Sequence, residues 1–378
     1  MQDTAPHTAS SPDRRAIADW IRLEQAAGVG CRTGKLLLDV FGSPAAIFAA
    51  SHAALAAQVP LATAAALCAP VSAELAQQVE RTLAWLAAPQ RHLLTLHDPD
   101  YPAALRHIPD PPLLLYLQGR RSLLGAPMIA VVGSRNASTQ GRANAENFAQ
   151  ALSRAGLCVV SGMALGIDTA AHEGALRGPG ATIAVIGTGA DRVYPARNRA
   201  LAHRIAVEGC IVSEYALGTP PVASNFPRRN RIISGMAAGV LVVEAAAQSG
   251  SLITAQMAAE QGREVFALPG SIHSALAKGC HQLIREGAQL VEAVDDVLAA
   301  LQVSPLVRTP ALVAAAGDGA LLAALGHEPM EPDRLLACLD ADAGWLAGEL
   351  LALELAGMLE RLPDGRVQRV VRAAEGAR

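Results

Sequence analysis

Aromatic rings and charges are both scarce in this chain. Of its 378 residues only 3% are Phe, Trp or Tyr and 17% are charged, whereas 51% are hydrophobic. So high a hydrophobic fraction excludes a disordered chain, and so few rings leave Ala, Leu, Val and Ile to build the core. At roughly 150 residues per domain, the length predicts two or three domains.

A positive net charge is also missing. The formal net charge is -3 and the isoelectric point is about 6.4. A protein that holds nucleic acid by charge alone is basic overall. Any nucleic-acid site in this chain is therefore expected to be a local patch.

Cysteine pairs, an apolar leader and long apolar runs are absent as well. Met1 to Arg15 is polar, unlike a signal peptide, and no apolar run reaches about 18 residues. We therefore expect a cytoplasmic protein with no membrane span. None of the cysteines forms a CxxC pair, which predicts buried thiols in a reducing cytosol rather than a disulfide framework or a metal site. They are Cys31, Cys68, Cys158, Cys210, Cys280 and Cys338.

Residues 1–88 are predicted to be helical. Gly28-Val29-Gly30 separates a run that starts near Ala16 from a second run, Arg32 to Phe41, which stops at Gly42. Ser43 and Pro44 then restart a helix as N-cap and first residue. This order is typical of a helix-hairpin-helix or sterile-alpha-motif-like module, whose turn amides can contact a phosphate. A plain small helical bundle explains the pattern as well.

Residues 89–301 alternate short apolar strands with helices, which predicts an α/β, Rossmann-like parallel sheet covered on both faces. In such a sheet ligands bind beyond the carboxyl ends of the strands. The predicted strands are Met128–Val132, Leu157–Val160, Thr182–Ile186, Val240–Glu244 and Glu264–Leu268, and the predicted helices are Gly141–Ala155, Asp168–Leu176, Asn198–Glu208, Ile232–Ala238 and Leu252–Gln261.

The C-terminal part predicts a linker and a small domain. Residues 302–317 contain Pro305 and Pro310 and show no period. In residues 318–378, helices at Ala320–Leu325, Arg334–Leu339 and Trp345–Leu355 precede two short strands, Met358–Leu362 and Arg366–Val371, the order of a winged helix. This block has eleven acidic and six basic residues, 6 − 11 = −5. Because a DNA-reading helix needs donors, we expect the wing to contact protein or a partner subunit.

Two of the loops that follow predicted strands are rich in arginine. Gly133, Ser134 and Arg135 follow the first strand, where a guanidinium and a helix N-terminus suit a phosphate. The segment Asn225–Gly235 places three arginines in four residues beside an aromatic ring at a helix start, which predicts a polyanion site with a stacking ring. Its candidate contacts are Phe226, Arg228, Arg229, Asn230 and Arg231.

The remaining loops are rich in glycine and serine. Asp168 and His172 follow the Gly162 loop, and we favour a helix cap and a structural histidine over an acid–base pair. A GxGxxR loop starts like a dinucleotide fingerprint but lacks the third glycine, and a Ser-Gly-Ser helix start has no GK[ST] for nucleotide hydrolysis. The candidate phosphate contacts here are Gly162, Gly187, Gly189, Ser249, Gly250, Ser251, Thr254 and Lys278.

Taken in order, these loops resemble the DNA-processing protein A (DprA/Smf) family over nearly the whole chain. The most specific segments are GSR at Gly133–Arg135, SGMALGIDTAAH at Ser161–His172, NFPRRNRIISG at Asn225–Gly235 and SGSLITA at Ser249–Ala255. Tyr194-Pro195 and LIREGA at Leu283–Ala288 agree with it.

The resemblance implies single-stranded-DNA binding at the strand ends, a homodimer through the Rossmann-like domain, protection of incoming DNA during natural transformation and loading of RecA. It implies no catalysis and no cofactor. Arg135 becomes a backbone-phosphate contact, and the arginines of Arg228–Arg231 line the same site. The family has a basic residue directly after the Tyr-Pro pair; here Ala196 follows and Arg197 comes next. For the dimer interface the sequence suggests only the apolar segment near Ile232–Val243.

Two other functions remain as alternatives. A nucleoside-phosphate hydrolase has a similar fold, but its Gly-Gly-x-Gly-Thr loop with a following glutamate is not matched by Ser249–Thr254 and Glu260. An NAD-dependent dehydrogenase is disfavoured by the broken fingerprint and by the lack of an acidic residue at the usual distance.

Overall fold

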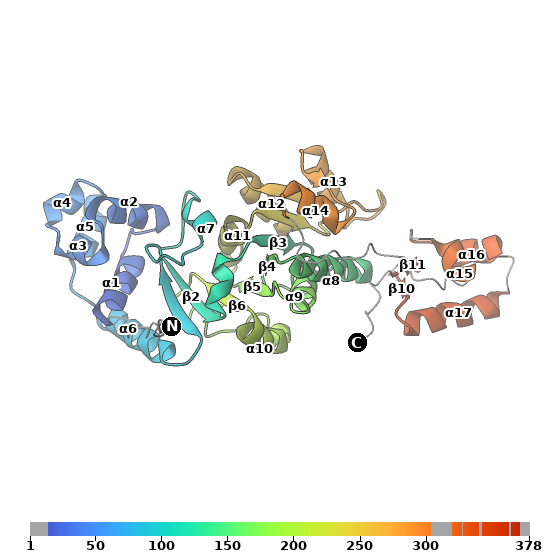
Figure 1. The fold of residues 1–378 in the computed structure, drawn as a ribbon, viewed down its shortest axis with the longest axis horizontal. Coiled ribbons are helices and arrows are strands. Elements are labelled where there is room, and N and C mark those ends of the chain that lie inside the picture. Colours follow the sequence, from blue (N-terminus) through green and yellow to red (C-terminus); the bar gives the residue numbers. More distant parts are fainter. Residues whose placement is uncertain (1–13, 304–319, 327, 340–341, 363, 371–378) are drawn as a thin grey trace, which may run out of the picture. The chain divides into compact units, whose positions relative to one another are not determined.

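The computed structural model describes residues 14–303, 320–326, 328–339, 342–362 and 364–370 (Figure 1). Most of the predicted linker, residues 304–317, lies outside this part. The chain forms two compact units. The first comprises Met1–Gln118, Thr188–Arg192 and Val212–Pro220, and the second Gly119–Gly187, Val193–Ile211 and Pro221–Arg378. The first unit thus extends beyond the helical block predicted for residues 1–88.

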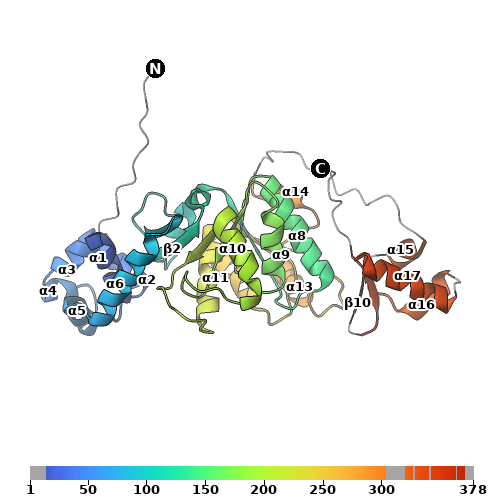
Figure 2. The same ribbon diagram turned by 90° about the horizontal axis from the view of Figure 1, so that it is seen from below.

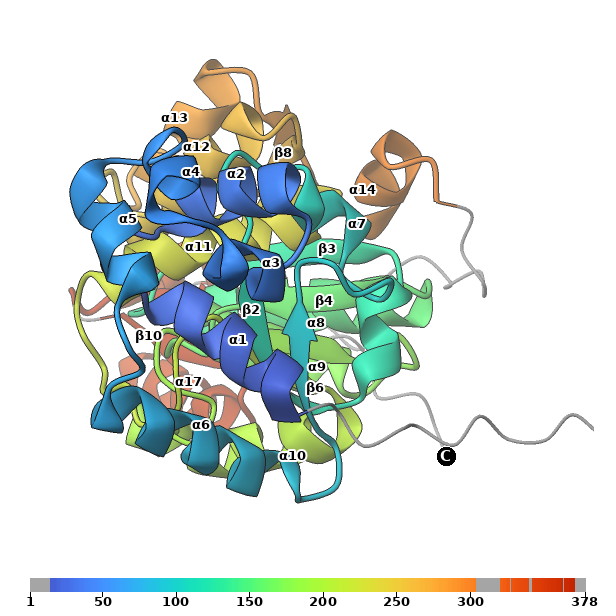
Figure 3. The same ribbon diagram turned by 90° about the vertical axis from the view of Figure 1, so that its left-hand side faces the viewer.

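The first unit begins with six short helices (Figure 3). The predicted stop and restart between the second and third are confirmed: Gly42 has φ 83, and the Ser43 hydroxyl accepts a hydrogen bond from the Ala46 amide at 3.2 Å. Gly28 has φ +81, and a Cβ there would come within 2.3 Å of the Thr63 hydroxyl. Backbone conformation and packing therefore explain this glycine without a phosphate contact. The helices are α1 Arg14–Gln25, α2 Cys31–Phe41, α3 Pro44–Ala49, α4 His52–Ala56, α5 Leu61–Cys68 and α6 Ala73–Leu86.

A strand pair that the sequence did not predict follows these helices. Strand β1 (Arg91–Thr95) pairs antiparallel with β2 (Leu114–Gly119), and the short helix α7 (Ala103–Arg106) lies between them in sequence. The Tyr101 hydroxyl donates to the Pro112 carbonyl at 2.9 Å and fixes the connection.

The second unit is built on the predicted parallel sheet. The strand order is β6-β5-β4-β3-β7-β8-β9, and the pairs from β5 to β9 are parallel. The chain moves outward from β3 in one direction and then returns to place β7 on the other side. The strands are β3 Met128–Val132, β4 Cys158–Ser161, β5 Thr182–Val185, β6 Cys210–Ser213, β7 Gly239–Val242, β8 Glu264–Ala267 and β9 Gln289–Leu290.

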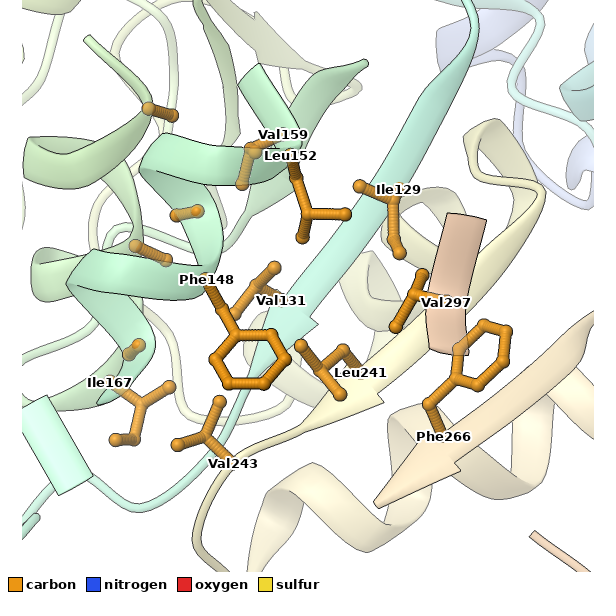
Figure 4. Close-up of a cluster of buried hydrophobic side chains, with 14 of the residues drawn as sticks. Ile129, Val131, Phe148, Leu152, Val159, Ile167, Leu241, Val243, Phe266 and Val297 are labelled. Carbon is orange, nitrogen blue, oxygen red and sulfur yellow. The ribbon is translucent and has the colours of Figure 1, made fainter. Parts of the chain in front are cut away.

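Helices cover both faces of this sheet, as predicted. Ile129 and Val131 point to one face, where they pack with Phe148 of α8, Ile167 of α9 and Val297 of α14 (Figure 4). Helices α8, α9 and α10 can be followed in Figure 2; α11 and α12 pack together on the other face. The helices are η1 Arg121–Gly125, α8 Thr139–Arg154, α9 Ile167–Ala175, η2 Ala196–Asn198, α10 Arg199–Glu208, α11 Asn225–Met236, α12 Gly250–Glu260, α13 Lys278–Arg285 and α14 Val294–Ala300.

The C-terminal part has the predicted winged-helix order, with three helices before an antiparallel strand pair. The apolar core joins all of them, from Leu321 on the first helix to Val367 on the last strand. The elements are α15 Ala320–Leu325, α16 Pro332–Leu339, α17 Ala343–Leu355, β10 Leu359–Arg361 and β11 Val367–Arg369.

Two predictions are corrected by side-chain burial. Cys158, Cys210 and Cys280 are buried thiols, but Cys68 and Cys338 are exposed because they lie on the outer faces of short helices. The segment Ile232–Val243, suggested as a dimer interface, instead packs into the core of its own unit, where Ile232 and Val240–Val242 are fully buried.

Candidate nucleic-acid interface

The topological switch of the sheet lies between β3 and β7. Because β4, β5 and β6 extend to one side of β3 and β7, β8 and β9 to the other, the loops after β3 and β7 separate there. In open α/β sheets this is where ligands bind. The predicted contacts Gly133–Arg135 follow β3, and Ser249–Ser251 follow β7.

The loop after β3 is held tightly by its neighbours. The Ser134 amide donates to the Glu244 carbonyl at 2.7 Å, and the Ser134 carbonyl accepts from the Ile167 amide at 3.1 Å. A Cβ at Gly133 would lie 2.8 Å from the Glu244 carbonyl oxygen, which only glycine tolerates. Arg135 leaves this anchored loop as an exposed side chain, and no hydrogen bond or ion pair joins it to another described residue. Its guanidinium is available to a ligand.

The N-terminus of α8 already holds an anion of the protein. The Glu244 carboxylate accepts from the Ser138 amide at 3.0 Å and from the Ser138 hydroxyl at 2.6 Å. A Cβ at Gly141 would come within 2.2 Å of this carboxyl group. Burial raises the pKa of Glu244, and its two bonds to Ser138 oppose the rise. The sequence had suggested that a phosphate near Arg135 would also bind the N-terminus of this helix. Because Glu244 occupies that position, we no longer expect this contact.

The arginine run divides because it lies within α11. This helix starts at Asn225, seven residues before the predicted start at Ile232, so successive side chains point in different directions. Arg228 is exposed and Asn230 is half-buried, whereas Arg229 is only 4% exposed and Arg231 only 5%. Of the three predicted arginine contacts in this run, only Arg228 faces solvent.

Arg229 acts inside the protein. Its Nη1 donates to the carbonyl oxygens of Gly162 and Val185, and its Nε donates to Asn230 at 3.0 Å. Burial raises the pKa of Asp168, and the nearby Arg229 charge opposes this rise. The guanidinium thus fastens the ends of β4 and β5 to α11.

His172 is structural, as the sequence favoured. Its Nδ1 donates at 2.7 Å to the Thr182 hydroxyl, which itself donates to the Val159 carbonyl. Burial, together with the nearby charge of Arg229, lowers the pKa of His172 to about 3. Asp168 is not the N-cap of α9, which is Gly166; its carboxylate accepts from the Ala164 amide at 3.2 Å.

An aromatic pair connects the loop after β5, which carries Tyr194, with the first turn of α11, which carries the half-buried Phe226. The rings of Tyr194 and Phe226 have centroids 5.4 Å apart at 37°, and Tyr194 is 47% exposed. The pair is positioned by Asn225, whose side-chain amide donates to the Gly187 carbonyl at 3.1 Å, and by Gly187, whose Cβ position would lie 3.0 Å from the Phe226 ring. Arg197 follows in η2 and is exposed. Tyr194 was not predicted as a contact, although it is one of only four tyrosines.

The other predicted contacts differ in accessibility. Ser249 caps α12 by accepting from the Ser251 amide at 3.3 Å, and its hydroxyl lies 2.7 Å from that of Ser251. Gly250 is exposed, but Ser251 and Thr254 are buried. The Lys278 ammonium donates to the Ile272 carbonyl. Gly189 belongs to the first compact unit, where its amide donates to the Thr219 carbonyl at 3.1 Å.

Two kinds of site are absent from the described part of the chain. No group of three or more His, Cys, Asp or Glu side chains there is arranged to hold a metal ion. Within the same residues, no helix is both long and apolar enough to cross a bilayer.

Comparison with known proteins decides the family. The sequence profile described as DNA recombination-mediator protein A matches residues 92–302, and that of the DprA winged helix domain matches residues 308–365. This chain belongs to the DNA recombination-mediator protein A family. It is 52% identical to DNA processing protein DprA of Streptococcus pneumoniae over 202 residues, which are 53% of this chain and 71% of that protein. It is 40% identical to Protein Smf of Escherichia coli over 307 residues, 77% of this chain and 81% of that protein.

Solved structures of DprA proteins share the fold. The X-ray structure from S. pneumoniae superposes with a TM-score of 0.65 at 38% identity and covers 75% of this chain and 97% of its own. A structure from Helicobacter pylori, described as showing a unique single-stranded DNA binding mode of DNA processing protein A, gives a TM-score of 0.51 at 30% identity. It covers 56% of this chain and 96% of its own.

Proposed function

We propose that this protein is a recombination mediator that binds single-stranded DNA at the strand ends of its second unit. The observation that carries the proposal is the Tyr194–Phe226 ring pair, in which Tyr194 is exposed and Phe226 is half-buried. Exposed arginines lie on the same two segments, at Arg197 and Arg228. Stacking rings beside guanidinium groups suit bases and phosphates of one strand. Arg135, on the loop after β3, extends the basic surface.

A single strand fits this arrangement better than a duplex. Base faces in a duplex are stacked and paired, so an exposed ring reaches them only when the strand is open. The chain has a formal net charge of -3, and the arginines that remain accessible are few. We therefore expect stacking to supply a substantial part of the affinity, in addition to the salt-sensitive phosphate contacts.

For the cellular role, we extend the proposal to what the family resemblance implies. In this proposal the protein works in the cytoplasm as a homodimer formed through its Rossmann-like domain, residues 89–301. It protects incoming DNA during natural transformation and delivers the strand to RecA. We also propose that it catalyses no reaction; the burial of the acid–base candidates Asp168 and His172 in a hydrogen-bonded network supports this.

A nucleoside-phosphate hydrolase is disfavoured by Glu244. Such enzymes commonly hold phosphate at a helix N-terminus, and in this protein the amide and the hydroxyl of Ser138, the N-cap of α8, both donate to the Glu244 carboxylate. A second anion there would meet like charge.

Binding of fluorescent oligothymidine at two salt concentrations, beside a nucleotide-hydrolysis assay, tests the proposal. We expect saturable binding that weakens with salt and no turnover. Nucleotide turnover that disappears in Arg135→Ala would establish the hydrolase instead.

A further inference from the structure

The outer face of α17 is apolar, although a winged helix normally uses this helix to read DNA. Leu346, Leu350 and Leu353 point into the domain core. Since each helical residue advances by about 100°, the opposite direction belongs to Gly348, Leu351 and Leu355. Both leucine side chains are exposed to solvent: Leu351 is 55% exposed and Leu355 is 81% exposed.

Acidic residues border this face on both sides. On the helical projection Glu349 lies toward one flank and Glu354 toward the other, and the whole helix Ala343–Leu355 carries no basic residue. Asp342 caps its start by accepting from the amides of Gly344 and Trp345. The nearest described cation is Arg361, whose Nε lies 4.0 Å from Glu354. The major groove presents acceptors between two phosphate backbones, so this surface is repelled by duplex DNA.

The small residues leave space for a close partner. Gly344, Gly348 and Ala352 recur at a spacing of four along the outer side of α17, which allows another helix to approach the backbone closely. Trp345 lies at the edge of the same face and is 46% exposed. An apolar strip between two acidic margins complements an amphipathic helix with basic margins.

We propose that the outer face of α17 docks an amphipathic helix of a partner protein whose apolar stripe is flanked by Lys or Arg. The leucines and Trp345 cover the apolar stripe of that helix, and Glu349 and Glu354 select its charge. The winged helix is thereby a protein-docking module, distinct from the DNA-binding face of the second unit.

Two designed peptides test this on the full-length protein. Both are helices of about 18 residues with one leucine stripe; one carries Lys on its flanks and the other Glu. Fluorescence anisotropy of the labelled peptides measures affinity at low salt. We expect the Lys peptide to bind at least about threefold more tightly, and the Glu349→Lys/Glu354→Lys variant to reverse this preference.

A matched pair of surface variants tests the apolar part. Leu351→Ser/Leu355→Ser is expected to weaken Lys-peptide binding by about tenfold or more. Val207→Ser changes a residue of α10 whose exposure lies between those of the two leucines, and it should leave Lys-peptide binding unchanged. Oligothymidine binding should be the same in all of these variants, which separates a failed docking site from a failed DNA site.

Three outcomes would overturn the proposal. The first is equal affinity for the two peptides, or none for either. The second is self-association of the protein that Leu351→Ser/Leu355→Ser abolishes, which would assign the face to a second copy. The third is duplex DNA binding that is lost in the same variant.

Discussion

The guanidinium of Arg229 lies against Gly162, where a Cβ would come within 2.2 Å of it. The same guanidinium donates to the Gly162 and Val185 carbonyl oxygens. A cation from the most basic segment of the sequence is therefore used to hold two strand ends and α11 together. Contact with a ligand is left to the exposed Arg228 on the same helix.

Replacement of Arg229 should harm stability first. Arg229→Ala leaves two carbonyl oxygens without their donor and Asp168 without its nearby cation, and loss of one partner of a buried charge pair costs about 3–5 kcal/mol. The exposed Arg228→Ala on the same helix is the matched control and should change the free energy of unfolding by no more than about 0.5 kcal/mol. Urea unfolding measures both. Equal stability of the two variants would mean that the buried hydrogen bonds of Arg229 do not stabilise the fold.

Arg135 should contribute to binding without contributing to folding. Arg135→Ala is expected to weaken oligothymidine binding by about 1–3 kcal/mol and to reduce the salt slope by about 0.7, the value for one phosphate of a single strand. Arg154→Ala, an exposed arginine at the opposite end of α8, is the control. Titrations over a range of salt give both quantities, and an unchanged slope in Arg135→Ala would contradict a phosphate contact.

The aromatic pair should act in the opposite way. Phe226→Ala removes a stacking surface worth about 1–3 kcal/mol per base but no charge, so affinity should fall while the salt slope stays the same. Phe226→Tyr retains a ring and should bind nearly as well as the wild type. The same titrations decide the point: if Phe226→Ala binds normally, bases do not stack there.

Gly141 and Glu244 should be energetically coupled. Gly141→Ala places a methyl group where the Glu244 carboxyl lies, and overpacking of this kind costs about 1–3 kcal/mol. Glu244→Ala in the same protein removes the obstacle, so the double variant should lose less stability than the sum of the single variants. A double-mutant cycle by urea unfolding measures this coupling, and additive losses would show that the two residues do not meet.

His172 should make the protein acid-sensitive. Burial lowers its pKa to about 3 from the usual 6.5, so between these values the unfolded chain binds a proton that the folded protein does not. The free energy of unfolding therefore decreases as the pH is lowered through this window, by at most about 1.4 kcal/mol per pH unit. Asp168 opposes this trend because its raised pKa favours proton uptake by the folded protein.

His172→Asn keeps a donor for Thr182 but does not titrate. Stability measured by urea unfolding at several pH values between 7 and 4 should fall less steeply in this variant than in the wild type. Parallel curves for the two proteins would show that His172 is not buried in its neutral form.

Much of the fold was predictable because local signals and tertiary packing agree. Strand β3 begins and ends at the predicted residues, and β4, β5, β7 and β8 differ by one or two positions, since each is a short Val- and Ile-rich run bounded by loop residues. Strands β1, β2, β6 and β9 were missed. The residue pattern of these segments does not reveal the strands with which they pair elsewhere in the chain.

The site was less predictable because burial depends on distant residues. Gly133 and Arg135 were found from their place after a strand, and the structure keeps Arg135 exposed. Arg229 looked like a DNA contact because the carbonyl oxygens that bind it come from other segments. The helix predicted from Ile232 begins instead at Asn225, since Pro227 is tolerated in the first turn.

The central claim is that rings and arginines at the strand ends bind one DNA strand, and one titration tests it most directly. Labelled oligothymidine is titrated with wild-type protein and with the Arg135→Ala/Phe226→Ala variant, after urea unfolding has shown equal stability. We predict that the variant loses at least about 2 kcal/mol of binding free energy, the sum of a modest phosphate contact and a modest stacking contact. Wild-type affinity in this folded double variant would contradict the account.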